Sequence, residues 1–137
     1  MLQWFQFKEP LPNKIKRIVI VDDNRDSADT LAMLIQTEGH SVFVAYDAQT
    51  GLRLAQESSP HIIFHDIAMP GIDGYAAARR LRSEERIKST LLVAVTAHDR
   101  TSDRRSALLA GFDLHLTKPV EFDEIKLILN NPNNLRH

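Results

Sequence analysis

The sequence contains no cysteine, which excludes disulfide bonds, zinc–thiolate centres and cysteine nucleophiles. It also has almost no excess charge. Lysine and arginine number 17 against 18 aspartate and glutamate residues, and the formal net charge is −1. A balance this close to neutral provides no overall field to recruit nucleic acid or an anionic membrane. We therefore expect neither as a partner, and the missing cysteines agree with a cytoplasmic location.

Long hydrophobic runs are missing as well. No apolar stretch approaches the ~20 residues that cross a bilayer, and residues 1–10 lack the basic start and continuous apolar segment of a signal peptide. The 137 residues are the usual size of one domain. We expect an N-terminal arm (1–14), one domain (15–130) and a C-terminal tail (131–137).

Short apolar runs alternate with amphipathic segments along the chain. Runs that predict buried strands occupy residues 17–21, 40–45, 61–65, 91–95 and 112–116. Apolar residues at helical spacing follow each run, and the arginines at 79, 80, 82 and 86 are interpreted as a solvated helix face. Five such units predict an α/β fold with a parallel sheet, right-handed crossovers and helices on both faces.

Acidic residues stand where two of these strands end. Asp22 and Asp23 follow the first strand, and Asp66 follows the third. In doubly wound sheets the ligand crevice lies beyond the carboxyl ends of the strands, where the strand order reverses. For the five-stranded order 2-1-3-4-5 this point lies between strands one and three. That order therefore predicts that the three carboxylates share one crevice.

Three neighbouring carboxylates repel one another strongly unless a proton or a cation is present. Oxygen ligands of this kind suit Mg²⁺ rather than zinc. Thr96 and Lys118 follow the fourth and fifth strands, so they offer a hydroxyl and an ammonium to a phosphoryl group at the same edge. The loop after the first strand has no glycine, which argues against a nucleotide or flavin site. Helix capping alone would not require the third acid.

Four motifs in this order resemble the receiver domains of two-component response regulators. They occupy residues 19–23, 65–74, 95–97 and 116–119. The likeness runs from about Lys14 to about Leu129. It implies a flavodoxin-like three-layer sandwich with the doubly wound sheet order 2-1-3-4-5, and a signalling protein rather than a metabolic enzyme.

The resemblance implies a role for each matching acid. Asp66 would accept a phosphoryl group from the phosphohistidine of a sensor histidine kinase or a histidine phosphotransfer protein, and would carry intrinsic autophosphorylation and autodephosphorylation chemistry. Mg²⁺, or Mn²⁺ in its place, would be held by Asp22, Asp23, Asp66 and the backbone carbonyl of Ala68.

Roles for the strand-end residues follow from the same resemblance. Lys118 would pair with the phosphoryl group, and a cis peptide bond between Lys118 and Pro119 would aim its amine into the crevice. The hydroxyl of Thr96 would move toward the phosphoryl group, and the side chain at position 115 would turn inward with it. Thr96 and His115 therefore form the expected switch.

Several positions depart from the usual pattern of the family. His115 stands where receivers usually have tyrosine or phenylalanine, so we expect a weaker switch that titrates near neutrality. Ala68 and His98 are candidate modulators: Ala68 offers no polar side chain beside the phosphoryl site, and His98 could lean over it. His65 points away from Asp66 by strand alternation, which predicts a hydrogen-bonded core histidine.

Two other functions stay open on the sequence alone. The first is a receiver-like module that binds proteins without being phosphorylated, although the complete set of acids, threonine and lysine argues against it. The second is a small aspartate-nucleophile phosphatase, which often needs a second acid two residues after the nucleophile. This chain has Ala68 there.

The output surface is expected on the face of the fourth helix, fifth strand and fifth helix. That face should carry Arg100, Arg104 or Arg105, and His115. An unidentified downstream protein, or a second copy in a phosphorylation-dependent homodimer, would bind there.

Overall fold

The computed structural model describes residues 15–97 and 101–131, with the backbone alone for 101–103. Its strands are β1 (Arg17–Val21), β2 (Ser41–Ala45), β3 (Ile62–Asp66), β4 (Leu91–Thr96) and β5 (Leu114–Thr117). Its helices are α1 (Arg25–Thr37), α2 (Ala48–Ser58), α3 (Gly74–Arg82), the short 3₁₀ helix η2 (Glu85–Ile87), α4 (Thr101–Ala110) and α5 (Phe122–Asn130). The predicted alternation of strands and helices is confirmed. The expected arm, and the expected tail after residue 131, lie outside the described residues.

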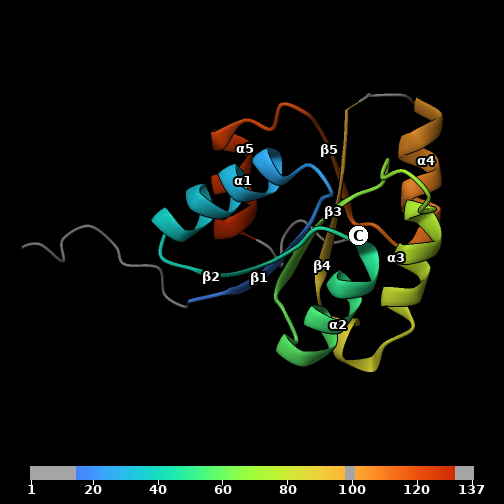
Figure 1. Cartoon of the computed structure of the whole chain (residues 1–137), viewed down its shortest axis with the longest axis horizontal. Helices are drawn as coiled ribbons and strands as arrows, with labels where there is room; N and C mark the ends of the chain where they lie inside the picture. Colours follow the sequence, from blue (N-terminus) through green and yellow to red (C-terminus); the bar gives the residue numbers. More distant parts are fainter. Residues whose placement is uncertain (1–14, 98–100, 132–137) are drawn as a thin grey trace, which may run out of the picture.

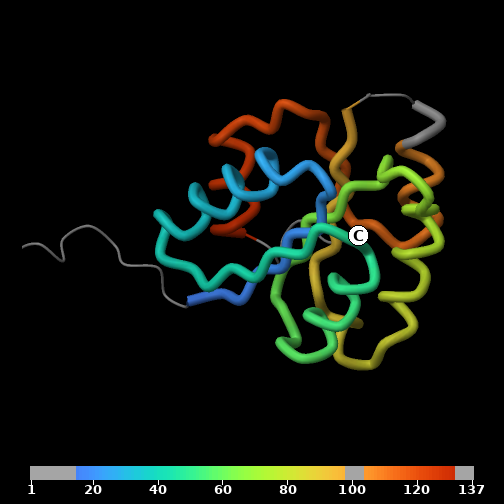
Figure 2. The backbone as a smooth tube through the Cα atoms, viewed as in Figure 1, coloured from blue at the N-terminus to red at the C-terminus, as the bar shows by residue number. Residues whose placement is uncertain are grey.

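The five strands form one parallel sheet in the order β2-β1-β3-β4-β5, as predicted. In Figure 2 the blue strand β1 lies between β2 and the green strand β3. The register pairs Val21 with His65 and Asp66 with Val95, so β1, β3 and β4 end at the same edge of the sheet. The strand order reverses between β1 and β3, and this is where a crevice is expected in such sheets.

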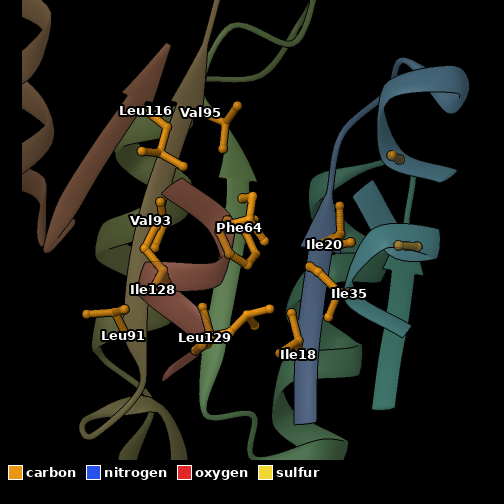
Figure 3. Packing of buried hydrophobic residues seen from close by; sticks show 14 residues of the cluster. Ile18, Ile20, Ile35, Phe64, Leu91, Val93, Val95, Leu116, Ile128 and Leu129 are labelled. Carbon is orange, nitrogen blue, oxygen red and sulfur yellow. The ribbon is translucent and has the colours of Figure 1, made fainter. Parts of the chain in front are cut away.

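Helices cover both faces of the sheet: α1 and α5 lie on one, and α2, α3 and α4 on the other (Figure 1). Alternation along β1 sends Ile18 and Ile20 to the first face and Val19 and Val21 to the second. On the first face, side chains from the sheet meet those of α1 and α5 (Figure 3), including Ile20, Phe64, Val93, Ile35, Ile128 and Leu129. Both faces are thus apolar, which explains the continuous β-branched runs in the sequence.

Polar caps mark where the first three helices begin. The side chain of Asn24 accepts a hydrogen bond from the Ser27 amide at the start of α1, and Asp47 accepts one from Thr50 at the start of α2. Asp73 accepts from two amides at the start of α3, as predicted for it. Among the described residues, none of the helices combines the length and hydrophobicity that a bilayer span requires.

The start of β5 differs from the prediction, which placed it at Phe112. The strand begins at Leu114 because the Phe112 amide still bonds to Ala107 at the end of α4. The Asp113 carboxylate turns inward instead, where it binds Arg82 and the Leu92 amide. Arg82 is accordingly an exception to the predicted solvated face, since its guanidinium is engaged by backbone carbonyls and Asp113.

The start of β2 also moves by one residue, from His40 to Ser41. His40 is buried, and its ring nitrogen Nδ1 accepts a hydrogen bond from the backbone amide of Lys16 at 3.0 Å. Similarly, Nδ1 of His61 accepts from the amide of Arg17 at 3.0 Å. Two histidine side chains thus bind consecutive amides where the chain enters β1.

Candidate functional site

Asp22, Asp23 and Asp66 meet at the edge where β1 and β3 end. One carboxylate oxygen of each residue lies within 4.8 Å of those of the other two. Asp22 and Asp66 are each only 6% exposed, whereas Asp23 is exposed. The structure therefore brings together the three acids that the strand order predicts to share one crevice. Asp22 and Asp66 are buried there, and Asp23 is open to solvent.

Short backbone turns fix the two buried carboxylates. Oδ1 of Asp22 accepts a hydrogen bond from the amide of Asn24 at 3.0 Å. Oδ1 of Asp66 accepts one from the amide of Ala68 at 2.8 Å. Each residue therefore keeps its second oxygen, Oδ2, for other contacts in the crevice.

Lys118 occupies that position between the two acids. Its Nζ lies 2.8 Å from Oδ2 of Asp22 and 3.2 Å from Oδ2 of Asp66. The backbone amide of Lys118 donates to the carbonyl of Thr96 at 2.7 Å, which holds the end of β5 beside β4. The Lys118–Pro119 peptide bond is cis, and this prediction is confirmed.

The surroundings raise the pKa values of both Asp66 and Lys118. Burial raises the pKa of Asp66, and the Asp22 carboxylate adds to this effect, against the Ala68 amide and the Lys118 ammonium. Burial by itself lowers the pKa of Lys118, but the combined attraction of Asp22 and Asp66 outweighs it and the pKa is raised. Lys118 is therefore a firmly held cation, while the ionised form of Asp66 is disfavoured.

These residues fit a small, hard cation. Three carboxylates with converging oxygens form the kind of donor set that Mg²⁺ prefers. Burial and the Asp22 carboxylate keep the pKa of Asp66 raised despite Lys118, so a bound cation would further stabilise the ionised form of Asp66. Asp23 faces solvent, so its carboxylate would be the ligand that an entering ion meets first.

The other expected site residues differ in their burial and in their distance along the strands from the carboxylates. Thr96 ends β4 at the same edge and is buried, and Thr117 lies opposite it in the register. His115 is half-buried on β5, opposite Ala94. Ala68 is exposed at the crevice edge. His98 lies outside the described residues.

Of the three arginines expected on the output face, the structure describes the side chains of two. Arg104 and Arg105 are exposed on α4, which belongs to that face. Arg100 lies outside the part of the chain that the structure describes.

His65 is buried, with 1% of its surface exposed, and bonds through Nδ1 to the backbone carbonyl of Asp66. Its ring meets Phe112 edge-on, with ring centroids 6.5 Å apart, on the sheet face covered by α2, α3 and α4. Burial lowers the pKa of His65, so the ring is neutral near pH 7. The prediction of a hydrogen-bonded core histidine is confirmed.

A groove of about 490 Å³ opens beside the carboxylates, and the sequence pattern did not reveal it. Its lining includes Leu31 and Leu34 together with the polar residues Ser27 and Thr30, all from α1. The segment 118–120, Asp22 and Val95 complete the lining. The signal available in the sequence was that Leu31 and Leu34 lie one turn apart on α1, but this spacing equally indicates a core contact.

Comparisons of the sequence with known proteins all point to one family. The sequence matches the family described as the response regulator receiver domain over residues 18–130. Protein PilH from Pseudomonas aeruginosa is 31% identical over 114 residues, which cover 83% of this chain and 94% of PilH.

Two solved structures are informative for the site. The receiver domain of the sensor histidine kinase PA1611 from Pseudomonas aeruginosa, with a magnesium ion coordinated in its active-site cleft, is 28% identical with a TM-score of 0.76. The match covers 85% of this chain and 95% of that one. A chain in the co-crystal structure of the Saccharomyces cerevisiae phosphotransfer protein Ypd1 with the receiver domain of Ssk1 is also 28% identical, with a TM-score of 0.74. That match covers 82% of this chain and 84% of that one.

Proposed function

The chain belongs to the response regulator receiver domain family, and we propose that it accepts a phosphoryl group on Asp66 and passes the signal to a protein partner. The observation that carries this proposal is the position of Lys118, bridging the buried carboxylates of Asp22 and Asp66 beside the exposed Asp23. A purely structural ion pair would need only one acid. Three acids and one lysine at the reversal point of the sheet suit the transfer of a charged group.

The chemistry follows from these positions. An oxygen of the Asp66 carboxylate attacks the phosphorus of a phosphohistidine in line with the bond to nitrogen. The oxygen–phosphorus bond forms as the phosphorus–nitrogen bond breaks, and the electron pair of that bond stays on the imidazole. Lys118 balances the charge on the phosphoryl oxygens, and the Thr96 hydroxyl donates a hydrogen bond to one of them. Mg²⁺ would be held by Asp22, Asp23, Asp66 and the Ala68 carbonyl, and would supply further charge neutralisation when bound.

The groove beside α1 supports a protein as the donor. It leads to Asp22 and Lys118, and its walls combine Leu31, Leu34 and Val120 with the acidic residue Asp26. The Ypd1–Ssk1 structure shows a receiver domain together with a histidine phosphotransfer protein. By analogy we propose a sensor kinase or phosphotransfer protein as the partner of this chain, with residues 15–130 as the receiver domain and a cytoplasmic location.

The test is incubation with Mg²⁺ and a small phosphodonor such as phosphoramidate, followed by mass spectrometry of the reduced acyl phosphate. Label on Asp66 supports the proposal. Asp66→Asn should remove the label, and Asp26→Asn, its matched control, should keep it. Asp26 is an exposed acid nearby that lines the groove but does not belong to the carboxylate cluster. Label elsewhere would contradict the assignment of the acceptor. Its complete absence would favour the module that binds partners without phosphorylation.

The cation has its own test. Saturating Mg²⁺ should raise the melting temperature of the wild type by mass action. Asp23→Ala should remove most of that rise, because it deletes the exposed ligand at the mouth of the site. A melting temperature that Mg²⁺ leaves unchanged would contradict the cation site.

A further inference from the structure

His65 makes a contact that the transfer chemistry does not use. Its Nδ1 lies 2.8 Å from the carbonyl oxygen of Asp66, the next residue along β3. A carbonyl oxygen only accepts hydrogen bonds, so Nδ1 must carry a proton to make this contact. The imidazole therefore donates a hydrogen bond to the backbone of Asp66.

This hydrogen bond fixes one side of the peptide that joins Asp66 to Ile67. The other side is fixed by β4, because the Ile67 amide donates to the Val95 carbonyl at 3.2 Å. Peptide groups are planar, so contacts at both the carbonyl and the amide determine the orientation of the whole unit. The next amide, of Ala68, is the one that donates to the Asp66 carboxylate at 2.8 Å. The contact from His65 is thus one peptide away from the group that aims the carboxylate.

The imidazole ring is itself held in place. It is almost fully buried and meets the Phe112 ring edge-on, at an angle of 66° between the ring planes. Phe112 lies between α4 and β5, on the opposite side of the sheet from the α1 face. A ring packed in this way cannot follow the peptide if the peptide rotates.

We propose that His65 is a positioning residue for phosphoryl acceptance, acting through the Asp66–Ile67 peptide. Its Nδ1–H holds this peptide in the orientation that places the Asp66 carboxylate and the Ala68 backbone for the phosphoryl group and the cation. His65 touches neither, and no change in its protonation is involved. The inference rests on the proposed function, with Asp66 as the acceptor.

Two substitutions separate positioning from packing. His65→Leu fills the buried volume with apolar atoms but has no donor, whereas His65→Asn keeps an N–H donor in a smaller side chain. A packing role predicts that the leucine variant is the better one in every measurement. Positioning predicts a crossed result, in which leucine is at least as stable as asparagine but slower in phosphorylation. His65→Phe serves as a second apolar variant if leucine does not fold.

The experiment measures three quantities on the full chain: phosphorylation by phosphoramidate, the Mg²⁺ dissociation constant by calorimetry, and the melting temperature. For His65→Leu we expect the maximal rate to fall about tenfold, because small displacements of reacting groups have large kinetic effects. The donor concentration at half-maximal rate should stay unchanged. Mg²⁺ binding should weaken about threefold. His65→Asn should recover most of the rate and the Mg²⁺ affinity despite a lower melting temperature.

The outcomes divide cleanly. If the wild type is labelled at Asp66 and the leucine variant matches it in rate and Mg²⁺ affinity, the inference is overturned while the proposed function stands. Asparagine as slow as leucine also overturns it, because the N–H then has no effect. If the wild type is labelled at another residue or not at all, the proposed function fails, and the Mg²⁺ affinities of the two variants decide whether His65 positions the Ala68 backbone.

Discussion

At the scale of single residues, the crevice is dominated by the contacts of one ammonium group. Lys118 binds an oxygen of Asp22 and an oxygen of Asp66, and each acid keeps its other oxygen on a backbone amide. A metal ion would therefore share these acids with the lysine, whereas the oxygens of a phosphoryl group would bind the lysine itself. Its removal should affect the two ligands in opposite ways.

We expect Lys118→Met to bind Mg²⁺ more tightly than the wild type but to accept phosphoryl groups more slowly. Loss of a positive charge beside the carboxylates removes its repulsion of Mg²⁺, which is worth on the order of 1 kcal/mol at a partly hydrated site. The same loss leaves the charge of the incoming phosphoryl oxygens less balanced. Calorimetry and labelling rates measure the two effects. Lys126→Met, at an exposed position on α5, is the control, and weaker Mg²⁺ binding in Lys118→Met would contradict this account.

Asp66→Asn should abolish labelling and leave the free energy of unfolding unchanged or higher at pH 7. The folded-state pKa of Asp66 is raised, mainly by burial, so folding disfavours its ionised form. The stability linked to this group is present below its unfolded pKa of 3.8 and is lost as the pH rises through the folded pKa. The wild type carries that penalty at pH 7, and the asparagine does not. Urea denaturation in the absence of Mg²⁺ measures it.

At the scale of elements, contacts between distant segments hold the sheet ends and the helices together. The guanidinium of Arg82, at the end of α3, donates to the carbonyls of Gly111, Ile87 and Thr90 and pairs with Asp113 before β5. Where the chain enters β1, His40 and His61 accept hydrogen bonds from the amides of Lys16 and Arg17. Both sets of contacts are testable by stability measurements.

Arg82→Ala should lower the free energy of unfolding by about 3 kcal/mol, because it leaves the buried Asp113 carboxylate without its cation. Arg80→Ala is the matched control. Arg80 lies on the same helix and pairs with Glu84 at the surface, where such pairs contribute at most about 1 kcal/mol. Urea denaturation of both variants gives the comparison. Equal losses would show that Arg82 is no more than another surface arginine.

The stability of the wild type should fall as the pH is lowered from about 7 toward 5, through His40 among other groups. Burial lowers the pKa of His40, and Lys16 and His61 lower it further against the opposing effect of Glu38. Its contribution is therefore present above its unfolded pKa of 6.5 and is lost as the pH falls through the lower folded value. His40→Asn keeps an acceptor for the Lys16 amide but does not titrate. Its unfolding free energy should depend less on pH over this range.

These contacts show why the sequence predicts some features better than others. The order of the strands and the meeting of Asp22, Asp23 and Asp66 follow from a repeated local pattern and a general rule of parallel sheets. The Arg82–Asp113 pair joins residues 31 positions apart, and no local period connects them. The start of β5, two residues later than predicted, likewise depends on a contact that no local period shows, the hydrogen bond from the Phe112 amide to the Ala107 carbonyl at the end of α4.

At the scale of the whole molecule, the expected output surface is the face formed by α4, β5 and α5. We expect phosphorylation to strengthen self-association or partner binding on this face, through Thr96 and His115. Because histidine titrates near neutrality, the effect should vary between roughly pH 6 and 8. Sedimentation of the phosphorylated chain across this range measures self-association. His115→Tyr should remove the pH dependence and preserve the response to phosphorylation, and an unchanged pH profile would make His115 a bystander.

The position of the carboxylates at the edge of the sheet also bears on how long a phosphoryl group would last on Asp66. Asp23 and Ala68 are exposed beside Asp66, and Ala68 adds only a methyl group next to the acceptor. A phosphoryl group on Asp66 would therefore remain within reach of water throughout its existence. On the proposed function, the phosphorylated state would then be short-lived, and a partner that covers this edge would lengthen its lifetime without changing the rate of phosphorylation.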